Sequence, residues 1–245
     1  MKKILLAAAI LLAMTGCAQA PETKSGGLKV VAASSWEAGF AKAAGATDVS
    51  VIVPAGVSHA PDYDPKPSDL AKAAEADIVL YAAFEGFAGK LKEAAGSKAK
   101  VIEVALDNSP EKVKAEVARL AAEFGTGEAA RTWAASLDTE YAALKQKLAG
   151  KSPVIVSQAF VAWAADLAGV QPAGVYGPQP PTAAEIAGLV AKKPTLILDN
   201  SAMPAGDTLG DVQAKRVVID NFPGADHDLI GMYKANAGLL QKALG

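Results

Sequence analysis

Residues 49–81 read VSVIVPAGVSHAPDYDPKPSDLAKAAEADIVLY and contain a strand, a loop, a helix and a second strand in succession. The apolar run Val49–Val53 predicts the first strand, and Ile78–Tyr81 predicts the second. Proline is favoured in the first turn of a helix, so the run Pro67–Ala74 predicts the helix between them. Strands that alternate with helices at this spacing form parallel sheets, and the stretch therefore predicts an α/β fold.

The loop of this unit holds His59, one of the 2 histidines in the chain. Pro61, Pro65 and Pro67 stiffen the loop, because proline fixes its own φ and restricts the residue before it. A rigid loop beyond the end of a strand can present an imidazole to a cleft, and we expect His59 to be the chief protein ligand of a binding site. From the residues alone, an ordinary surface histidine is an equal alternative.

The alternation of strands and helices continues in both directions along the chain. Residues 110–149 contain no strand candidate, and apolar spacing predicts two helices there, the second of roughly 21 residues from Glu128 to Leu148. The pattern predicts two α/β lobes with mostly parallel sheets, residues 28–109 and 150–245, joined by this long helical segment. The further expected strands are 28–32, 101–104, 154–156, 174–176, 195–198 and 217–220. The further expected helices are 36–44, 87–95, one that follows the strand 154–156 and runs through residue 163, 183–192 and 228–244.

The N-terminus has the pattern of an export signal. Two lysines precede the apolar run Ile4–Met14, which is too short to span a bilayer and is typical of a secretory signal. The run leads to Cys17, the only cysteine, in a sequence Ala-Met-Thr-Gly-Cys that resembles the bacterial lipobox. We expect residues 1–16 to be a lipoprotein signal peptide, Cys17 to be the acylated mature N-terminus, and residues 17–27 to be a flexible tether. The expected location is therefore an exported protein held on a membrane surface by lipid.

Composition and motifs exclude several classes of function. The formal net charge is −2, and without the 2 lysines of residues 1–16 the 22 basic groups face 26 acidic ones, so nucleic acid binding is not expected. Residues Gly125–Ala130 match the pattern G-x-G-x-x-A but lie between two predicted helices. A dinucleotide-binding motif would instead follow a strand, so we do not expect this function. The chain has no phosphate-binding loop and no G-x-S-x-G motif. We therefore expect a binding protein rather than an enzyme.

Several short motifs resemble one protein family. Pro65–Asp69, Ala76–Tyr81 and Glu85 are similar to the Pro-Thr-Pro-Ser-Asp, Ala-Asp-Leu-Val and following segments of the substrate-binding proteins of zinc and manganese ABC transporters. The likeness is strong over residues 28–95 and weaker to the C-terminus, where Tyr233–Asn236 resembles part of the family's last helix. The chain therefore resembles a divergent member of this family.

The resemblance implies a function as well as a fold. Proteins of this family have two lobes with the ligand buried between them. A relative of this kind would be a monomer that captures a transition-metal ion as cargo, uses no catalytic cofactor, and delivers the ion to an ABC permease. Zinc is favoured over manganese or iron, because imidazole is a good zinc ligand.

The ligand set that the family uses is incomplete in this chain. The family's first histidine would fall at Pro61, two residues after His59. The segments Asp107–Ser109 and Ser157–Phe160 occupy the places of two further histidines and contain none. The family's acidic ligand corresponds to Asp220.

We therefore expect His59 and Asp220 to be the metal ligands, contributed by different lobes and facing each other across the cleft. Trp36, Ser157 and Gln158 are expected to line the same ligand site. Other candidates beyond the strand ends, whose contribution the sequence leaves open, are Glu37, Asn108, Asp199, Asn221 and His227.

Two alternatives remain open at this point. The first is a related receptor for a chelated metal or a small organic ligand. The second is an extracytoplasmic hydrolase on the same scaffold, because a fold alone does not settle function. The aromatic residues expected to line the cleft in the first alternative are Trp36, Tyr63, Phe84, Phe160 and Trp163.

Overall fold

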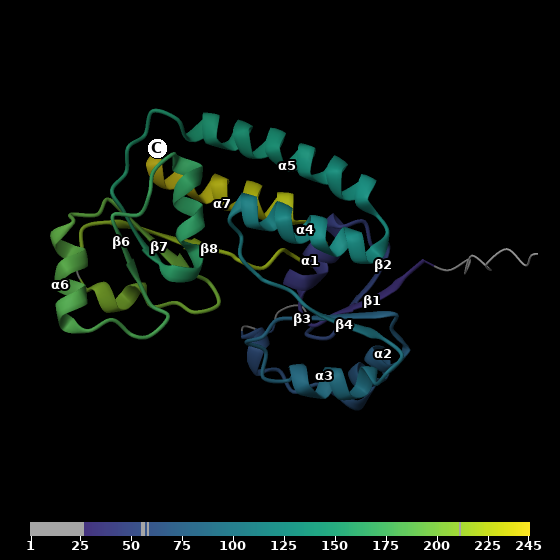
Figure 1. Ribbon diagram of the computed structural model, residues 1–245. Coiled ribbons are helices and arrows are strands. Elements are labelled where there is room, and N and C mark those ends of the chain that lie inside the picture. The colour runs from purple at the N-terminus through teal and green to yellow at the C-terminus, as the bar shows by residue number, and fades with distance from the viewer. Residues whose placement is uncertain (1–26, 55–56, 58, 211) are drawn as a thin grey trace, which may run out of the picture.

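The computed structural model describes residues 27–54, 57, 59–210 and 212–245 (Figure 1). The expectations for the signal peptide, for Cys17 and for nearly all of the tether fall outside these residues. Within the described part of the chain, no helix has both the length and the apolar character needed to cross a membrane.

The N-terminal lobe is built on one parallel sheet with the strand order β2-β1-β3-β4. Strand β1 lies between β2 and β3, with Val31 opposite Ser50 on one side and Val79 on the other. All four residues of β3 are buried, as expected for a strand covered by helices on both faces. The elements of this lobe are β1 (Lys29–Ala32), α1 (Ser35–Ala43), β2 (Asp48–Val51), a 3₁₀ turn (Ala60–Asp62), α2 (Pro67–Glu75), β3 (Ile78–Tyr81), α3 (Ala88–Ala95) and β4 (Lys100–Glu103).

The C-terminal lobe repeats this topology with the parallel strand order β6-β5-β7-β8. The two sheets lie in separate parts of the molecule (Figure 1), so the predicted two-lobed α/β fold is confirmed. The elements of this lobe are β5 (Ile155–Gln158), a 3₁₀ segment (Ala159–Ala168), β6 (Gly174–Tyr176), α6 (Ala183–Ala191), β7 (Leu196–Asn200), a 3₁₀ turn (Gly206–Leu209), β8 (Lys215–Ile219) and α7 (Leu229–Leu244).

Helices connect the two lobes. Figure 1 shows α5 (Gly127–Leu148) running along the molecule from one lobe to the other, with α4 (Pro110–Phe124) and α7 beside it. One cluster of buried apolar side chains passes through these helices and reaches both sheets, and it includes Leu80, Leu137 and Leu198. Because a shared core of this kind resists shear, we infer that the joint between the lobes is stiff.

The observed elements differ from the expected ones mainly at their ends. The expected helix after β5 is a 3₁₀ segment, which begins where the Gln158 side chain accepts a hydrogen bond from the Phe160 N–H at 2.7 Å. Strand β8 ends at Ile219, so Asp220 lies just beyond it rather than in it. This last difference affects the binding site.

Candidate functional site

A cavity of about 370 Å³ lies between the two lobes. Its walls come from segments that follow the carboxyl ends of strands in both sheets, which is where open α/β sheets bind ligands. The wall residues are Trp36, His59, Pro61, Phe84, Leu106, Phe160, Pro178, Asn200, Ala202, Met203, Asn221 and Phe222.

Four aromatic side chains, Trp36, Phe84, Phe160 and Phe222, lie on the cavity wall. The centroid of the Trp36 ring lies 5.1 Å from that of Phe222 and 6.5 Å from that of Phe84, both in tilted arrangements. Phe84 of the N-terminal lobe is 53% exposed and Phe160 of the C-terminal lobe is 50% exposed. The cavity therefore offers uncovered ring surface from both lobes.

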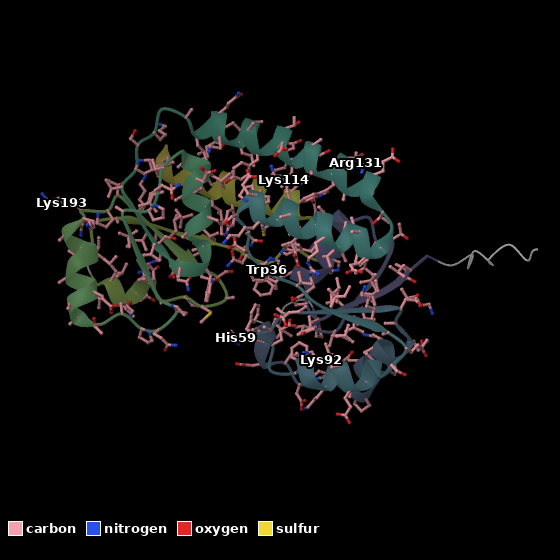
Figure 2. The ribbon with its side chains drawn as sticks, viewed as in Figure 1. Trp36, His59, Lys92, Lys114, Arg131 and Lys193 are labelled. Carbon is pink, nitrogen blue, oxygen red and sulfur yellow. The ribbon has the colours of Figure 1, made fainter. Side chains whose placement is uncertain are left out.

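His59 brings an imidazole to this wall. It immediately precedes the 3₁₀ turn Ala60–Asp62, and its Nδ1 lies 3.0 Å from Oδ2 of Asp62. Figure 2 shows Trp36 and His59 near each other where the two lobes meet. Although the family's histidine corresponds to Pro61, both His59 and Pro61 line the cavity, because the short turn keeps this whole segment at its edge.

A chain of side-chain hydrogen bonds crosses between the lobes beside the cavity. The Trp36 Nε1–H donates to Oδ1 of Asn108 at 2.9 Å, and Nδ2 of Asn108 donates to Oδ1 of Asn221 at 3.1 Å. The same Asn221 oxygen accepts from Nε1 of Trp163 at 2.9 Å, and the Asn221 amide nitrogen donates to the Phe160 carbonyl at 3.0 Å. We call these residues the amide relay. Both asparagine side chains are thus engaged by protein groups.

The structure does not bring Asp220 to the cavity beside His59. Asp220 is exposed, and its backbone N–H and carbonyl are both bonded to the Asn236 amide of α7, at 3.0 and 2.9 Å. Burial alternates at the end of β8, so that Ile219 and Asn221 are buried and Asp220 between them is not. This period of two continues past the strand and turns Asn221, rather than Asp220, toward the cleft.

Ser157 and Gln158 are buried but do not line the cavity. The Ser157 hydroxyl donates to the Gln158 carbonyl at 3.0 Å, and the Gln158 side chain caps the 3₁₀ segment that follows. Asp199 is also buried, and its carboxylate accepts from the backbone N–H groups of Ala205 and Gly206, both at 3.0 Å. These side chains organise the ends of the C-terminal strands.

The second histidine, His227, lies elsewhere. It lines a different cavity of about 460 Å³, together with Ser34 and Pro54 of the N-terminal lobe. Burial lowers the pKa of its imidazole, and the positive charge of Lys42 lowers it further. The structure therefore separates the two histidines into different sites.

Two of the five expected cleft aromatics also lie outside the wall. The Tyr63 hydroxyl donates to Asp69 at 2.9 Å, and its ring packs edge-on against Phe87. Trp163 reaches the site only through its bond to Asn221 and packs edge-on against Tyr233. Trp36, Phe84 and Phe160 do line the cavity, and Phe222 joins them, which the sequence did not indicate.

Two buried carboxyl groups lie next to the aromatic wall in the sequence. Glu37 follows Trp36 and is 0% exposed, and Glu85 follows Phe84 and is 4% exposed. Burial raises the pKa of both groups, and that of Glu85 rises to about 9, with the charge of Glu37 as the second cause. Glu85 is therefore protonated at neutral pH. Glu37 is held by the N–H and hydroxyl of Ser34 in a capping box at the start of α1.

Metal donors are scarce around the cavity. Across the described ranges, no three His, Cys, Asp or Glu side chains are grouped so that they could hold a metal ion. Among the wall residues given above, His59 is the one with an ionisable side chain. The site thus combines one imidazole with a largely apolar surface that includes four aromatic rings.

Comparisons with known proteins agree with this architecture. Residues 30–124 match the family described as "Zinc-uptake complex component A periplasmic". The chain is similar to the metal-ion receptors of ABC importers. The resemblance seen in its motifs is thereby confirmed, and the match covers the N-terminal lobe and α4. No curated protein matches the chain.

Solved structures extend the likeness to both lobes. The protein FpvC from Pseudomonas aeruginosa in complex with Mn²⁺ is 18% identical with a TM-score of 0.71, covering 89% of this chain and 98% of that one. A zinc-bound deletion mutant of ZnuA is 22% identical with a TM-score of 0.66, covering 90% and 99%. The laminin-binding protein Lmb of Streptococcus agalactiae is 17% identical with a TM-score of 0.68, covering 90% and 100%. At these identities the structures establish the shared fold alone.

Proposed function

We propose that the chain is an extracytoplasmic substrate-binding protein that captures a transition metal in the cavity between its lobes and passes it to an ABC permease. The observation that carries this proposal is the interlobe cavity with His59 on its wall. The matched family and the structural neighbours are binding proteins, and neighbours are described with Mn²⁺, Ni²⁺ and zinc. Zinc is the favoured cargo, because imidazole is one of its preferred ligands.

His59 is the proposed protein ligand of the metal. A carboxylate beside one nitrogen of a metal-binding histidine stabilises the proton there and leaves the other nitrogen free to coordinate. Asp62 lies 3.0 Å from Nδ1 of His59, near enough for this pairing although the two atoms are not aligned as a hydrogen bond, and we propose Nε2 as the coordinating atom. The sequence also predicts Asp220 as a metal ligand, although Asp220 does not line the cavity, so the same experiment includes a substitution of Asp220.

Metal content of the purified protein tests this function. We expect the wild type, purified without chelators, to carry a transition metal and His59→Ala, which lacks the proposed ligand, to carry only a small fraction of it. His227→Ala is the matched control, because that histidine lines the other cavity, and it should retain the metal. Asp220→Asn should also retain it.

Elemental analysis of the four proteins, prepared in parallel, decides between the outcomes. Equal metal in wild type and His59→Ala would remove His59 from the site. Loss of metal in Asp220→Asn would show that the Asp220 carboxylate is a ligand after all, and would imply a lobe movement that brings it to the cleft. A wild type without metal would refute the proposed cargo.

The lipid anchor belongs to the same proposal. We propose that Cys17 is acylated and holds the receptor near its permease on the membrane surface, at about 0.8 kcal/mol per buried CH₂ of the lipid. Cys17→Ser should move the protein from the membrane fraction to the soluble one, which fractionation and immunoblotting measure. A mutant that stays with the membrane would contradict acylation at this residue.

A further inference from the structure

The cavity wall has properties that a site for a bare ion does not need. It carries 4 aromatic side chains, Trp36, Phe84, Phe160 and Phe222, and one imidazole. Resting on the function proposed above, we propose that the metal enters this cavity as a low-charge complex with a flat aromatic chelator, with His59 completing its coordination.

The supply of donor atoms is the first argument. Zinc and similar ions take three or four N, O or S ligands from protein. His59 supplies one, and the side-chain amides of Asn108 and Asn221 are engaged in the amide relay. The Asn200 side-chain oxygen accepts from the Ala202 N–H at 3.0 Å. Most ligands of the metal must therefore come from the molecule that carries it.

The size of the cavity is the second argument. Its volume of about 370 Å³ is roughly twelve times the share of one water molecule in the liquid, which is about 30 Å³. Pockets for small organic molecules have volumes of about 300–1,000 Å³. The cavity therefore has room for a complex of small aromatic rings.

The exposed rings are the third argument. Phe84 and Phe160 are each about half exposed, and they come from opposite lobes. Aromatic rings gain from offset or edge contacts with other rings beyond the gain from burial alone. A flat aromatic ligand would cover the two phenylalanines together, and the adjacent Trp36 and Phe222 rings would extend the same surface.

Charge narrows the class of ligand further. Apart from His59, the described residues of the wall have no ionisable side chain. Burying net charge in such surroundings is costly unless the charge is paired. The chelator must therefore neutralise most of the charge of the ion, as an anionic oxygen and nitrogen chelator does.

Zinc with two equivalents of 8-hydroxyquinoline is a suitable probe, because this chelator is flat, aromatic and anionic when bound. Fluorescence titration should show the complex binding at least about tenfold more tightly than either free zinc or the chelator with zinc removed by EDTA. The related chelator 8-hydroxyquinoline-5-sulfonate binds zinc through the same atoms but adds negative charge to the complex. Its zinc complex should therefore bind the protein more weakly.

Substitutions in the cavity wall test whether its aromatic rings cause the preference for the zinc–hydroxyquinoline complex. Phe84→Ala and Phe160→Ala should each weaken binding of the zinc–hydroxyquinoline complex by about tenfold, and both should fold normally because the two rings are half exposed. Val175→Ala is the matched control, since this valine of β6 is 51% exposed and does not line the cavity. It should bind the complex as the wild type does.

The outcomes separate this inference from the function on which it rests. Free zinc binding as tightly as the complex, with no effect of the phenylalanine substitutions, would overturn the chelate inference and leave metal capture intact. If the chelator bound the protein equally well without zinc, both the chelate inference and the proposed metal capture would be overturned, in favour of an organic ligand. Failure of zinc and of the complex to bind would also overturn both.

Discussion

Neighbouring residues at the cavity have opposite environments. In α1, Trp36 faces the cavity and Glu37 is fully buried, and in the loop after β3 the half-exposed Phe84 precedes the buried Glu85. Each pair places an aromatic ring at the ligand surface and a carboxyl group in the protein interior. Burial and, after it, the charge of Glu37 raise the pKa of Glu85 to about 9.

We predict that Glu85 makes the protein less stable as pH rises. Below a pH of about 4.5, its ordinary pKa, folded and unfolded chains both hold the proton, and the full contribution to stability is present. Between 4.5 and about 9 the unfolded chain releases the proton and the folded chain keeps it, so the free energy of unfolding falls as pH rises. The loss from this one group is at most about 1.4 kcal/mol per pH unit.

Chemical denaturation of wild type and Glu85→Gln at pH 5 and pH 8 measures this effect. The variant should lose less stability between the two values than the wild type does. Glu93→Gln, at an exposed site on α3, is the control and should follow the wild type. A Glu85→Gln protein with the wild-type dependence on pH would contradict the buried, protonated state of Glu85.

Close packing between elements fixes how the N-terminal lobe meets the connecting helices. Gly45 follows α1 with a φ of +94°, and a Cβ added there would lie 2.8 Å from the Cβ of Ala129 in α5. The side chain of Thr126 would be 3.0 Å from the same position. The conformation and the close approach both require glycine, so this position sets the spacing between the end of α1 and the start of α5.

We predict that Gly45→Ala lowers the free energy of unfolding by about 1–3 kcal/mol, through overpacking and an unfavourable φ. Gly89→Ala is the matched control, because Gly89 lies within α3 and nothing lies within 4 Å of its added Cβ. Alanine there should be neutral or stabilise by up to about 1 kcal/mol. Urea unfolding of both variants gives the comparison, and equal stabilities would contradict the proposed contact.

At the scale of the whole molecule, the amide relay holds the lobes together at the cleft. Asn108 follows the last strand of the N-terminal lobe, and Asn221 follows the last strand of the C-terminal lobe, 113 residues away. The Tyr233 hydroxyl of α7 also donates to the Asn108 carbonyl, at 2.7 Å. The relay and the shared core favour one fixed arrangement of the lobes over wide opening.

We predict that Asn108→Ala costs about 1–3 kcal/mol of stability, because it leaves the buried Trp36 N–H and Asn221 oxygen without one partner. Calorimetry measures the loss, and the tryptophan fluorescence, to which Trp36 and Trp163 contribute, should shift to longer wavelength as water reaches the cleft. A variant as stable as the wild type would show that water replaces the amide at no cost. Ala205→Gly, in a loop away from the relay, should leave the tryptophan fluorescence unchanged.

The sequence predicted the elements and the lobes because these depend on local patterns. The alternation of apolar runs with helical spacing, the prolines at helix starts and the glycine break at 125–127 are all read over short windows. The same local patterns placed His59 in a loop that follows a strand. The motifs of residues 65–85 also indicated a resemblance to one family, and the match over residues 30–124 confirms that resemblance.

The tertiary structure alone decided which side chains meet in the cleft. At the end of β8 the buried residue is Asn221, one position after the expected ligand Asp220, which is exposed. The alternation of buried residues that begins with Val217 and Ile219 already pointed to Asn221. The pairing of Asn108 with Asn221 and the rings around the cavity join residues more than a hundred positions apart. Periodicity determines which face of an element is buried, whereas the packing of the two lobes determines which buried groups become partners.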